Sequence, residues 1–376
     1  MNIVNAKVLS ADCARFIEGG IAVRDGKIES VGNIPSAVGD YDAQGLFVIP
    51  GMIDTHIHGS VAVEFASPDE DFERARVWLA RQGITSFAAT VRALPAEKTV
   101  AAIKNIVRES KKDSHGAKLK GIHIEGPFVS KERSGVMNPP DEICQVETFE
   151  KFVAAGEGLV KIMTLAPERE NALEVIRRAV QLGVNISIGH TMADYGTARA
   201  AVNAGACRAT HVFNAMRPFA HRDPGVLGEV LTDPRVNCEM ICDLVHNAAP
   251  TVEMVYKLKG AKGLTLVSDT GYMSGLGDGE FNVDGRIRYV KDGVCRNAEG
   301  RIAGSTVSML AGAKNLLKLG VPLCELAVIA SGNPAEALGI GGETGSISVG
   351  SAADLIVCDG ELNIRSVFVD GRIVGE

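Results

Sequence analysis

The sequence predicts an α/β fold, a (β/α)8 TIM-type barrel that carries a small β-sandwich domain built from both termini. Two observations predict it. Eight short apolar segments alternate with amphipathic helical segments through the middle of the chain, and short strands with Asp-Gly turns recur at both ends. Nearly continuous apolar strands fit a barrel, because its parallel strands are buried on both faces and need not alternate in polarity.

The two ends of the chain predict one shared domain. Strands are expected at residues 3–9, 21–24 and 27–31 and again at 353–358, 365–369 and 372–374. Neither group has enough strands to bury a face alone, so we expect the two groups to pair. The predicted domains are a β-sandwich of residues 1–50 and 345–376 and a catalytic barrel of residues 51–344.

The barrel strands follow from apolar runs that are separated by helical periodicity. The expected strands are 47–53, 84–90, 119–125, 159–165, 184–189, 207–211, 237–243 and 264–269, and the expected helices are 69–82, 96–110, 169–182, 194–204, 250–258, 306–319 and 323–331. Residues 279–304 interrupt this pattern with turns at Asp284-Gly285 and Asp292-Gly293, which predicts an inserted β-hairpin or two. A doubly wound open sheet is the alternative, but it does not explain why polar residues follow so many different strands.

Composition narrows the class of protein. The 376 residues are 46% hydrophobic and 23% charged, as in ordinary globular proteins. A net charge of −7, without a basic run among aromatic residues, argues against a nucleic-acid partner. The sequence shows neither a signal peptide nor an apolar stretch of membrane-spanning length, so we expect a soluble, cytoplasmic protein with no membrane partner. The eight cysteines contain no Cys-x-x-Cys pair, which favours buried free thiols in a reducing compartment.

The stretch LFVIPGMIDTHIHG, residues 46–59, carries the first chemical signal. An apolar strand ends in His56 and His58, and residues two apart in an extended backbone point to the same side. Neutral imidazole nitrogens are common zinc ligands, so this pair indicates a metal site. The alternative is that both histidines lie in a solvated loop.

Other strand ends supply matching groups, and in a barrel the chemistry lies at these ends. Glu125, His190 and His211 together provide one carboxylate and two nitrogens, the ligand set of a catalytic zinc site with an open position for water. Taken singly, each has a structural alternative: a paired carboxylate for Glu125 and core histidines for the other two. Asp269 is either a helix N-cap or, beside cations, a proton-transfer group. His123 is expected to support the site or to pack.

These residues resemble those of the amidohydrolase superfamily. The segment PGMIDTHIHG at 50–59, with later His190, His211 and Asp269, is similar to its metal-binding pattern. Within that superfamily, the segments GIHIEGPF (121–128), GHT (189–191), THVFNAM (210–216) and IAGS (302–305) resemble N-acetylglucosamine-6-phosphate deacetylases. The matching segments are spread over nearly the whole chain.

The resemblance implies one or two divalent ions per subunit, zinc or iron. Glu125, His190 and His211 would hold one ion, and His56, His58 and Asp269 would hold a second, with Glu125 bridging. It also implies that Asn214, the Ala215 backbone, Arg222 and His246 contact a sugar phosphate, with Arg222 reaching in from the other subunit of a homodimer. Met137 stands where the family usually has a histidine that helps polarise the acetyl carbonyl, and Met137 cannot donate that hydrogen bond.

The expected reaction is hydrolysis of the acetamide of an N-acetylhexosamine 6-phosphate, most simply N-acetylglucosamine 6-phosphate, to acetate and the free amine. Asp269 would accept a proton from the attacking water and return it to the amine. One alternative is the galactosamine epimer, another amide or a cyclic amide. A second alternative is a non-catalytic assembly protein on the same barrel, although such a protein would usually lose metal ligands and this chain keeps them.

Overall fold

The predicted barrel is confirmed. A computed structural model describes residues 1–283 and 285–375, so Asp284, and with it the predicted Asp284-Gly285 turn, lies outside the described residues. Parallel strands are hydrogen-bonded in chain order to form the barrel wall: β6 (Met52–Ile57), β9 (Ile84–Val91), β10 (Lys118–Glu125), β11 (Val160–Leu165), β12 (Asn185–Ile188), β13 (Arg208–Ala209), β14 (Asn237–Ile241) and β15 (Leu264–Val267).

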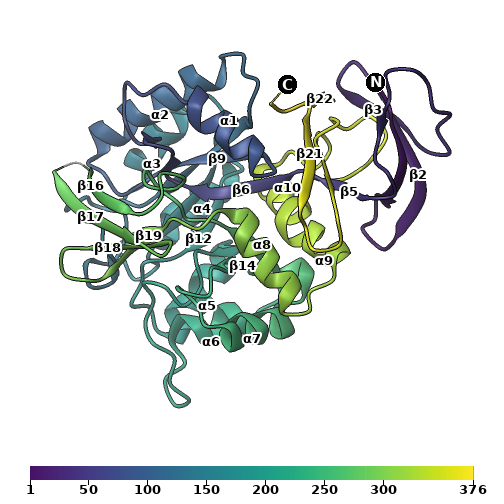
Figure 1. The fold of residues 1–376 in the computed structure, drawn as a ribbon. Coiled ribbons are helices and arrows are strands. Elements are labelled where there is room, and N and C mark those ends of the chain that lie inside the picture. Colours follow the sequence, from purple (N-terminus) through teal and green to yellow (C-terminus); the bar gives the residue numbers. More distant parts are fainter. Residues whose placement is uncertain (284, 376) are drawn as a thin grey trace.

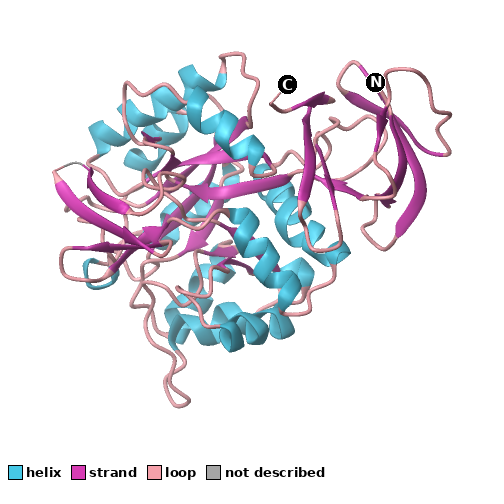
Figure 2. Cartoon of the chain, viewed as in Figure 1, coloured by secondary structure: helices cyan, strands magenta, loops and turns pink. Residues whose placement is uncertain are grey.

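Helices follow the strands and cover the outside of the barrel (Figure 2). They are α1 (Glu73–Arg81), α2 (Ala96–Ser110), α3 (Val146–Ala155), α4 (Ala172–Gln181), α5 (Tyr195–Ala204), α6 (Gly225–Thr232), α7 (Ala249–Lys259) and α8 (Met309–Lys318), and α9 (Leu323–Ala327) and α10 (Asn333–Leu338) follow, joined by a π-helical segment, Val328–Gly332. Local sequence fixes their ends, as α5 illustrates. The Asp194 side chain accepts a hydrogen bond from the Thr197 N–H at its start, and Gly205 adopts the left-handed conformation at its end.

The barrel closes where β15 returns to β6. Past the end of β15, the Asp269 N–H donates to the His56 carbonyl at 2.9 Å, and the His58 N–H donates to the Thr270 carbonyl at 2.7 Å. The amino end of the barrel is filled differently, since Ile53, Ala88 and Ile162 pack against Leu338 of α10. The carboxyl end is therefore left for polar groups.

The first predicted barrel strand, 47–53, is wrong as a single element. The segment divides at Gly51 into β5 (Phe47–Pro50), which belongs to another sheet, and β6 of the barrel. A Cβ at Gly51 would lie 2.2 Å from the Thr85 hydroxyl oxygen, so only glycine fits this close approach. Figure 1 shows β5 and β6 end to end, running from the second sheet into the barrel.

The second sheet combines strands from both ends of the chain, as expected. Its order is β22-β21-β20-β5-β1-β2-β3, and β4 also pairs with β1. These strands are β1 (Ile3–Leu9), β2 (Phe16–Arg24), β3 (Lys27–Gly32), β4 (Tyr41–Asp42), β20 (Leu355–Cys358), β21 (Ile364–Val369) and β22 (Arg372–Ile373). The Tyr41 hydroxyl lies 2.7 Å from the Ser366 hydroxyl, and its ring contacts Phe368. Both ends of the chain thus share one eight-stranded sheet and also pack through side chains.

A buried ion pair joins this sheet to the barrel. The Lys118 ammonium at the start of β10 lies 2.7 Å from carboxylate oxygens of both Asp354 and Asp370. Asp354 is fully buried at its side chain and also accepts hydrogen bonds from the Thr344 hydroxyl and the Asp370 N–H. Burial by itself would lower the pKa of Lys118, but the charges and hydrogen bonds of Asp354 and Asp370 together outweigh it and raise that pKa.

The insertion lies where it was expected and has the size of two hairpins. Four antiparallel strands, β16 (Gly279–Val283), β17 (Arg286–Lys291), β18 (Val294–Asn297) and β19 (Ile302–Ser305), form a separate sheet, at the left of Figure 1. Val290, Cys295 and Ala303 of this sheet pack with Met273 in an apolar cluster of their own. Two barrel helices, α3 and α6, were not among the elements expected from the sequence. In the part of the chain that is described, no helix has the length and apolar character needed to cross a membrane.

Candidate metal centre

Five strand ends bring the predicted ligands together at the carboxyl mouth of the barrel. His56 and His58 come from the end of β6, Glu125 is the last residue of β10, and His190, His211 and Asp269 each follow a strand by two residues. His56 is fully buried, and the side chains of His58 and Asp269 are each only 16% exposed. The predicted convergence is therefore observed.

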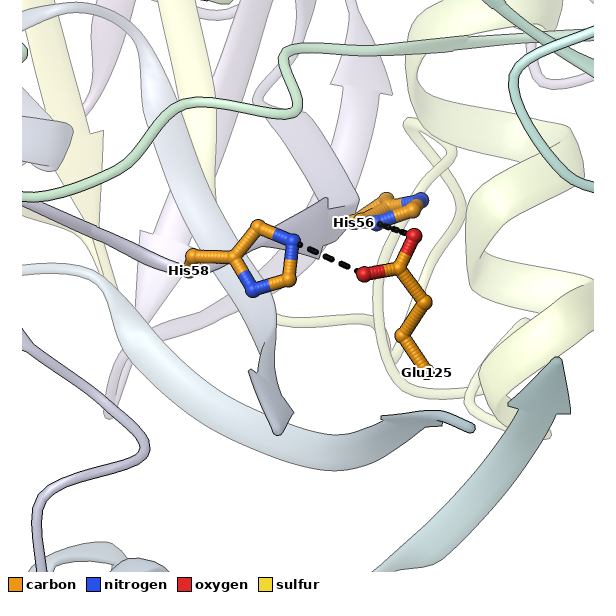
Figure 3. A group of neighbouring side chains, drawn as sticks. All are labelled: His56, His58 and Glu125. Carbon is orange, nitrogen blue, oxygen red and sulfur yellow. Dashed lines mark ion pairs between the residues drawn. The ribbon is translucent and has the colours of Figure 1, made fainter. Parts of the chain in front are cut away.

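Glu125 lies between two pairs of histidines. Its Oε1 atom is 2.9 Å from His190 Nε2, 3.2 Å from His211 Nε2 and 3.4 Å from His56 Nε2. Its Oε2 atom faces the other way and lies 3.2 Å from His58 Nε2 (Figure 3). Each histidine pair, together with Glu125, forms a group whose ligand atoms all lie within 4.8 Å of one another. One carboxylate is thus shared by both groups.

Asp269 completes the second group. Its Oδ1 atom is 3.3 Å from His58 Nε2 and 3.5 Å from His56 Nε2. The backbone holds Asp269, His190 and His211 at φ values of 48°, 48° and 28°, in the left-handed region that residues other than glycine rarely adopt. Such strain concentrates at functional sites, where the surrounding structure imposes it.

Hydrogen bonds on the outer side of two rings fix where their lone pairs point. His190 Nδ1 lies 2.8 Å from the Arg133 carbonyl oxygen, and His56 Nδ1 lies 3.2 Å from Glu239 Oε2. Both partners only accept hydrogen bonds, so each Nδ1 carries a proton and each ring turns its Nε2 atom towards Glu125. Each contact between an Nε2 atom and a carboxylate oxygen needs positive charge between the two atoms, which a metal ion or a ring proton can supply.

One unsatisfied atom points to the same requirement. His56 Nε2 is buried, lacks a hydrogen-bond partner among the described residues and faces Glu125 and Asp269. Imidazole nitrogens and carboxylate oxygens at strand ends are the donors that zinc and iron use. The residues present therefore fit a divalent metal ion.

The pKa values of residues in the centre depend mainly on burial and on oppositely charged neighbours within it. Burial would lower the pKa of His58, but its hydrogen bond to Asp269 and the nearby Glu125 raise that pKa to about 9. Burial would raise the pKa of Asp269, yet His56, His58 and His211 together outweigh it and hold that pKa well below its ordinary range. Asp269 is therefore ionised and able to accept a proton.

A cavity of about 320 Å³ opens onto this cluster. The predicted substrate contacts Met137, Asn214, Ala215 and His246 line its wall together with the cluster. A larger cavity of about 640 Å³ lies beside it and shares part of its lining, but none of the predicted site residues line it. We take the smaller cavity as the reaction site because the chemically active groups are there.

His246 is oriented by a residue that the sequence analysis did not identify. The Asp243 Oδ2 atom accepts a hydrogen bond from His246 Nδ1 at 2.7 Å, and Oδ1 accepts from the His246 backbone N–H. Burial would lower the pKa of His246, but Asp243 outweighs it and raises the pKa above its ordinary value. A signal was present in the sequence, because Asp and His three residues apart in a turn can reach each other.

Arg222 is the one predicted substrate contact that this chain does not bring to the cavity. It is exposed in the loop before α6, which projects from the body of the molecule in Figure 1, and it is absent from the cavity lining. His123 is also outside the ligand cluster. Its Nδ1 donates to the Thr55 carbonyl at 3.1 Å, its Nε2 contacts the Thr164 hydroxyl, and its ring packs edge-on against His56.

Comparisons with known proteins agree with this geometry. The sequence matches the Amidohydrolase family over residues 47–374. It is 34% identical to N-acetylglucosamine-6-phosphate deacetylase of Lysinibacillus sphaericus, over 99% of this chain and 97% of that protein. It is 31% identical to N-acetylgalactosamine-6-phosphate deacetylase of Escherichia coli O157:H7, over 99% of both. A mutant N-acetyl-D-glucosamine-6-phosphate deacetylase from Mycobacterium smegmatis, solved in complex with N-acetyl-D-glucosamine-6-phosphate, superimposes with a TM-score of 0.90 at 32% identity, covering 100% of this chain and 99% of that one.

Proposed function

Because the chain belongs to the amidohydrolase family, and within it to the N-acetylglucosamine-6-phosphate deacetylases, we propose that it hydrolyses the acetamide of N-acetylglucosamine 6-phosphate to glucosamine 6-phosphate and acetate. The observation that carries the proposal is the position of Glu125 between two histidine pairs at the mouth of the barrel. The complete set of ligand side chains argues against a non-catalytic assembly protein.

We assign the ligands to two ions. Glu125, His190 and His211 would hold the first, and His56, His58 and Asp269 the second, with Glu125 shared because its two oxygens face different histidines. Zinc and iron both suit this mixture of nitrogen and oxygen donors. The chemistry that such ions supply is acidification of a water molecule and polarisation of a carbonyl group.

Asp269 is the proposed proton carrier. Its ionised carboxylate faces the cavity beside His58, so it can accept a proton from the attacking water and then deliver it to the departing amine. Without that proton the amine would be a very poor leaving group. Met137 lines the cavity but cannot donate a hydrogen bond, so it gives the carbonyl oxygen no support.

The 6-phosphate is proposed to bind on the side of the cavity lined by Asn214, Ala215 and His246. The raised pKa of His246 favours its cationic form, which suits a phosphate dianion. Phosphate binding there would orient the acetamide towards Glu125 and Asp269, so that remote binding energy is used for alignment.

A homodimer would explain Arg222. The projecting loop before α6 places this arginine away from the cavity of its own chain, where it is free to reach the cavity of a second subunit. An arginine is well suited to that role, because its planar guanidinium binds phosphate through two hydrogen bonds.

The galactosamine epimer is a second candidate substrate. One relative that matches the full length of this chain is named an N-acetylgalactosamine-6-phosphate deacetylase. The Met137 substitution also lies in the wall that contacts the substrate. The two sugars differ only in the orientation of one hydroxyl group, so discrimination depends on a few polar contacts in this cavity.

We also propose that the protein works in a reducing compartment, the cytoplasm. All eight cysteines lie in the described part of the chain, and each has a free thiol. Burial raises the pKa of Cys238 and Cys358 to about 12, so these thiols are unreactive and suited to packing.

Acetate release tests the proposed function. The purified protein is assayed with both N-acetylhexosamine 6-phosphate epimers, the unphosphorylated sugars and a cyclic urea, while bound metal is quantified. We expect metal-dependent release from the glucosamine substrate, loss of activity with a chelator, and recovery with zinc or iron. Faster turnover of the galactosamine epimer would reassign the substrate, and activity confined to the cyclic urea would overturn the deacetylase proposal.

A further inference from the structure

An ion pair inside the barrel lies directly behind His56. Glu239 is the single acidic residue of β14, and it is 0% exposed. Its Oε2 atom is 3.2 Å from His56 Nδ1, while its Oε1 atom accepts hydrogen bonds from Arg208 at 3.0 and 3.3 Å. One oxygen of this carboxylate therefore contacts the proposed metal ligand His56, and the other contacts Arg208.

Keeping a carboxylate inside a barrel is costly, so its presence calls for a reason. Its neighbours along β14, Cys238 and Met240, are also 0% exposed, so the strand is buried on both faces. Arg208 is only 4% exposed, and its two N–H donors offset part of the cost of burying the Glu239 carboxylate. A pair of apolar residues would fill the same space at less cost, which indicates that Glu239 is kept for its contact with His56.

The contact decides which atom His56 presents to the metal centre. Because an ionised carboxylate only accepts, Nδ1 must carry the ring proton and Nε2 must present its lone pair towards Glu125 and Asp269. His190 is held in the same tautomer by a backbone carbonyl, that of Arg133, which no substitution removes. His56 depends instead on a side chain.

We propose that Glu239 is a positioning residue of the metal centre, which fixes the tautomer and ring orientation of His56, and that Arg208 holds Glu239 in place. The proposal rests on the assignment of two ion sites made above. It concerns the second site only, because Glu239 contacts neither His190 nor His211. Groups that orient a metal-binding histidine in this way commonly change metal affinity by about 10–100-fold when they are removed.

Two double variants test it. Arg208→Met with Glu239→Leu removes the charges and leaves His56 without an acceptor. Arg208→Met with Glu239→Gln also removes the charges but keeps an amide oxygen within reach of His56 Nδ1. Both replacements are neutral and similar in volume, so the pair isolates the hydrogen bond. Zinc is titrated into metal-free protein by calorimetry, and the free energy of unfolding is measured in parallel.

We expect the wild-type protein to bind two zinc ions per subunit. The leucine variant should bind the weaker ion about 10–100-fold less tightly while binding the other normally. The glutamine variant should stay close to wild type, with equal stability in both variants. Equal zinc affinity at both sites in the leucine and glutamine variants would overturn the positioning role, as would a wild-type protein that binds only one ion. A wild-type protein that binds no zinc or iron would instead overturn the proposed function.

Discussion

The two ends of the barrel both bury charged groups, but they treat them in opposite ways. At the amino end, Lys118 has two carboxylate partners, and Asp354 receives further hydrogen bonds from Thr344 and Asp370. At the carboxyl end, the buried His56 Nε2 has no hydrogen-bond partner among the described residues, and the Nε2 atoms of four histidines converge on the oxygens of Glu125. The first cluster is complete within the protein, whereas the second requires an additional cation.

This difference separates structural charge from functional charge. Removing a group from a completed cluster leaves its partner unpaired, so stability falls and chemistry is unaffected. Removing a group from an incomplete cluster changes what can bind there. Substitutions at the amino end should therefore lower stability and leave the reaction unchanged, whereas substitutions at the carboxyl end should change binding and the reaction.

The largest effect is expected for Asp269→Asn at the carboxyl end. The amide cannot accept the proton of the attacking water, so kcat should fall by about 10³–10⁴-fold, at the upper end of general-base effects. Bound metal is measured in the same sample, and the ion at Glu125, His190 and His211 should remain. A near-normal kcat would show that another group moves the proton.

At the amino end, Lys118→Met should cost stability without affecting the reaction. Asp354 would keep its other hydrogen bonds but lose its cation, so the free energy of unfolding in urea should fall by about 3 kcal/mol, the low end for breaking a buried pair. Lys120→Met is the matched control on the same strand, because Lys120 pairs with the exposed Glu343. That control should cost less than about 1 kcal/mol. Equal losses in the two variants would contradict the structural role of the Asp354 pair.

The ion pair of Lys118 also predicts how the free energy of unfolding changes with pH. The pKa of Lys118 is raised in the folded protein, so its contribution to stability is complete below the ordinary lysine pKa and is lost as the pH rises through the raised value. The stability difference between wild type and Lys118→Met should therefore be constant through neutral pH and shrink only in strong alkali.

Arg222→Ala tests whether Arg222 of one subunit contributes to the cavity of the other subunit. Loss of a charged hydrogen bond to phosphate should raise KM by about 10–100-fold with little change in kcat. Arg235→Ala, which removes an exposed arginine paired with Asp233, should leave KM unchanged. Mixed dimers of Arg222→Ala and Asp269→Asn subunits should recover sites with normal KM, because an intact Asp269 then meets an intact Arg222. Failure of that recovery would place Arg222 outside the neighbouring site.

The smallest effect is expected for Asp243→Asn. His246 would lose the charge that raises its pKa, so it would become neutral at a lower pH than in the wild type. At a pH low enough to protonate His246 in both proteins the KM values should be similar, whereas at a higher pH, where only the wild-type His246 stays cationic, the variant's KM should be raised by about threefold to tenfold. A KM ratio that does not vary with pH would show that Asp243 acts on packing alone.

The ligands could be predicted from the sequence because a barrel places every strand end at one mouth. An apolar run followed by His, Glu or Asp was therefore enough to locate Glu125, His190 and His211. Glu239 was missed because it lies inside an apolar strand. The Arg133 carbonyl was missed because every residue has a backbone carbonyl, so the sequence does not single one out. The division at Gly51 was missed because both sheets bury this segment, so hydropathy does not change where the chain passes between them.

One pairing in the second sheet has a consequence for synthesis on the ribosome. Strand β5, which leads directly into β6 and its histidines, lies between β1 and β20. The second of these neighbours comes from residues 355–358, more than 300 positions later in the chain. A nascent chain can thus assemble most of the barrel while the support beneath its first histidine pair is still missing, and full metal affinity should arise only late in translation.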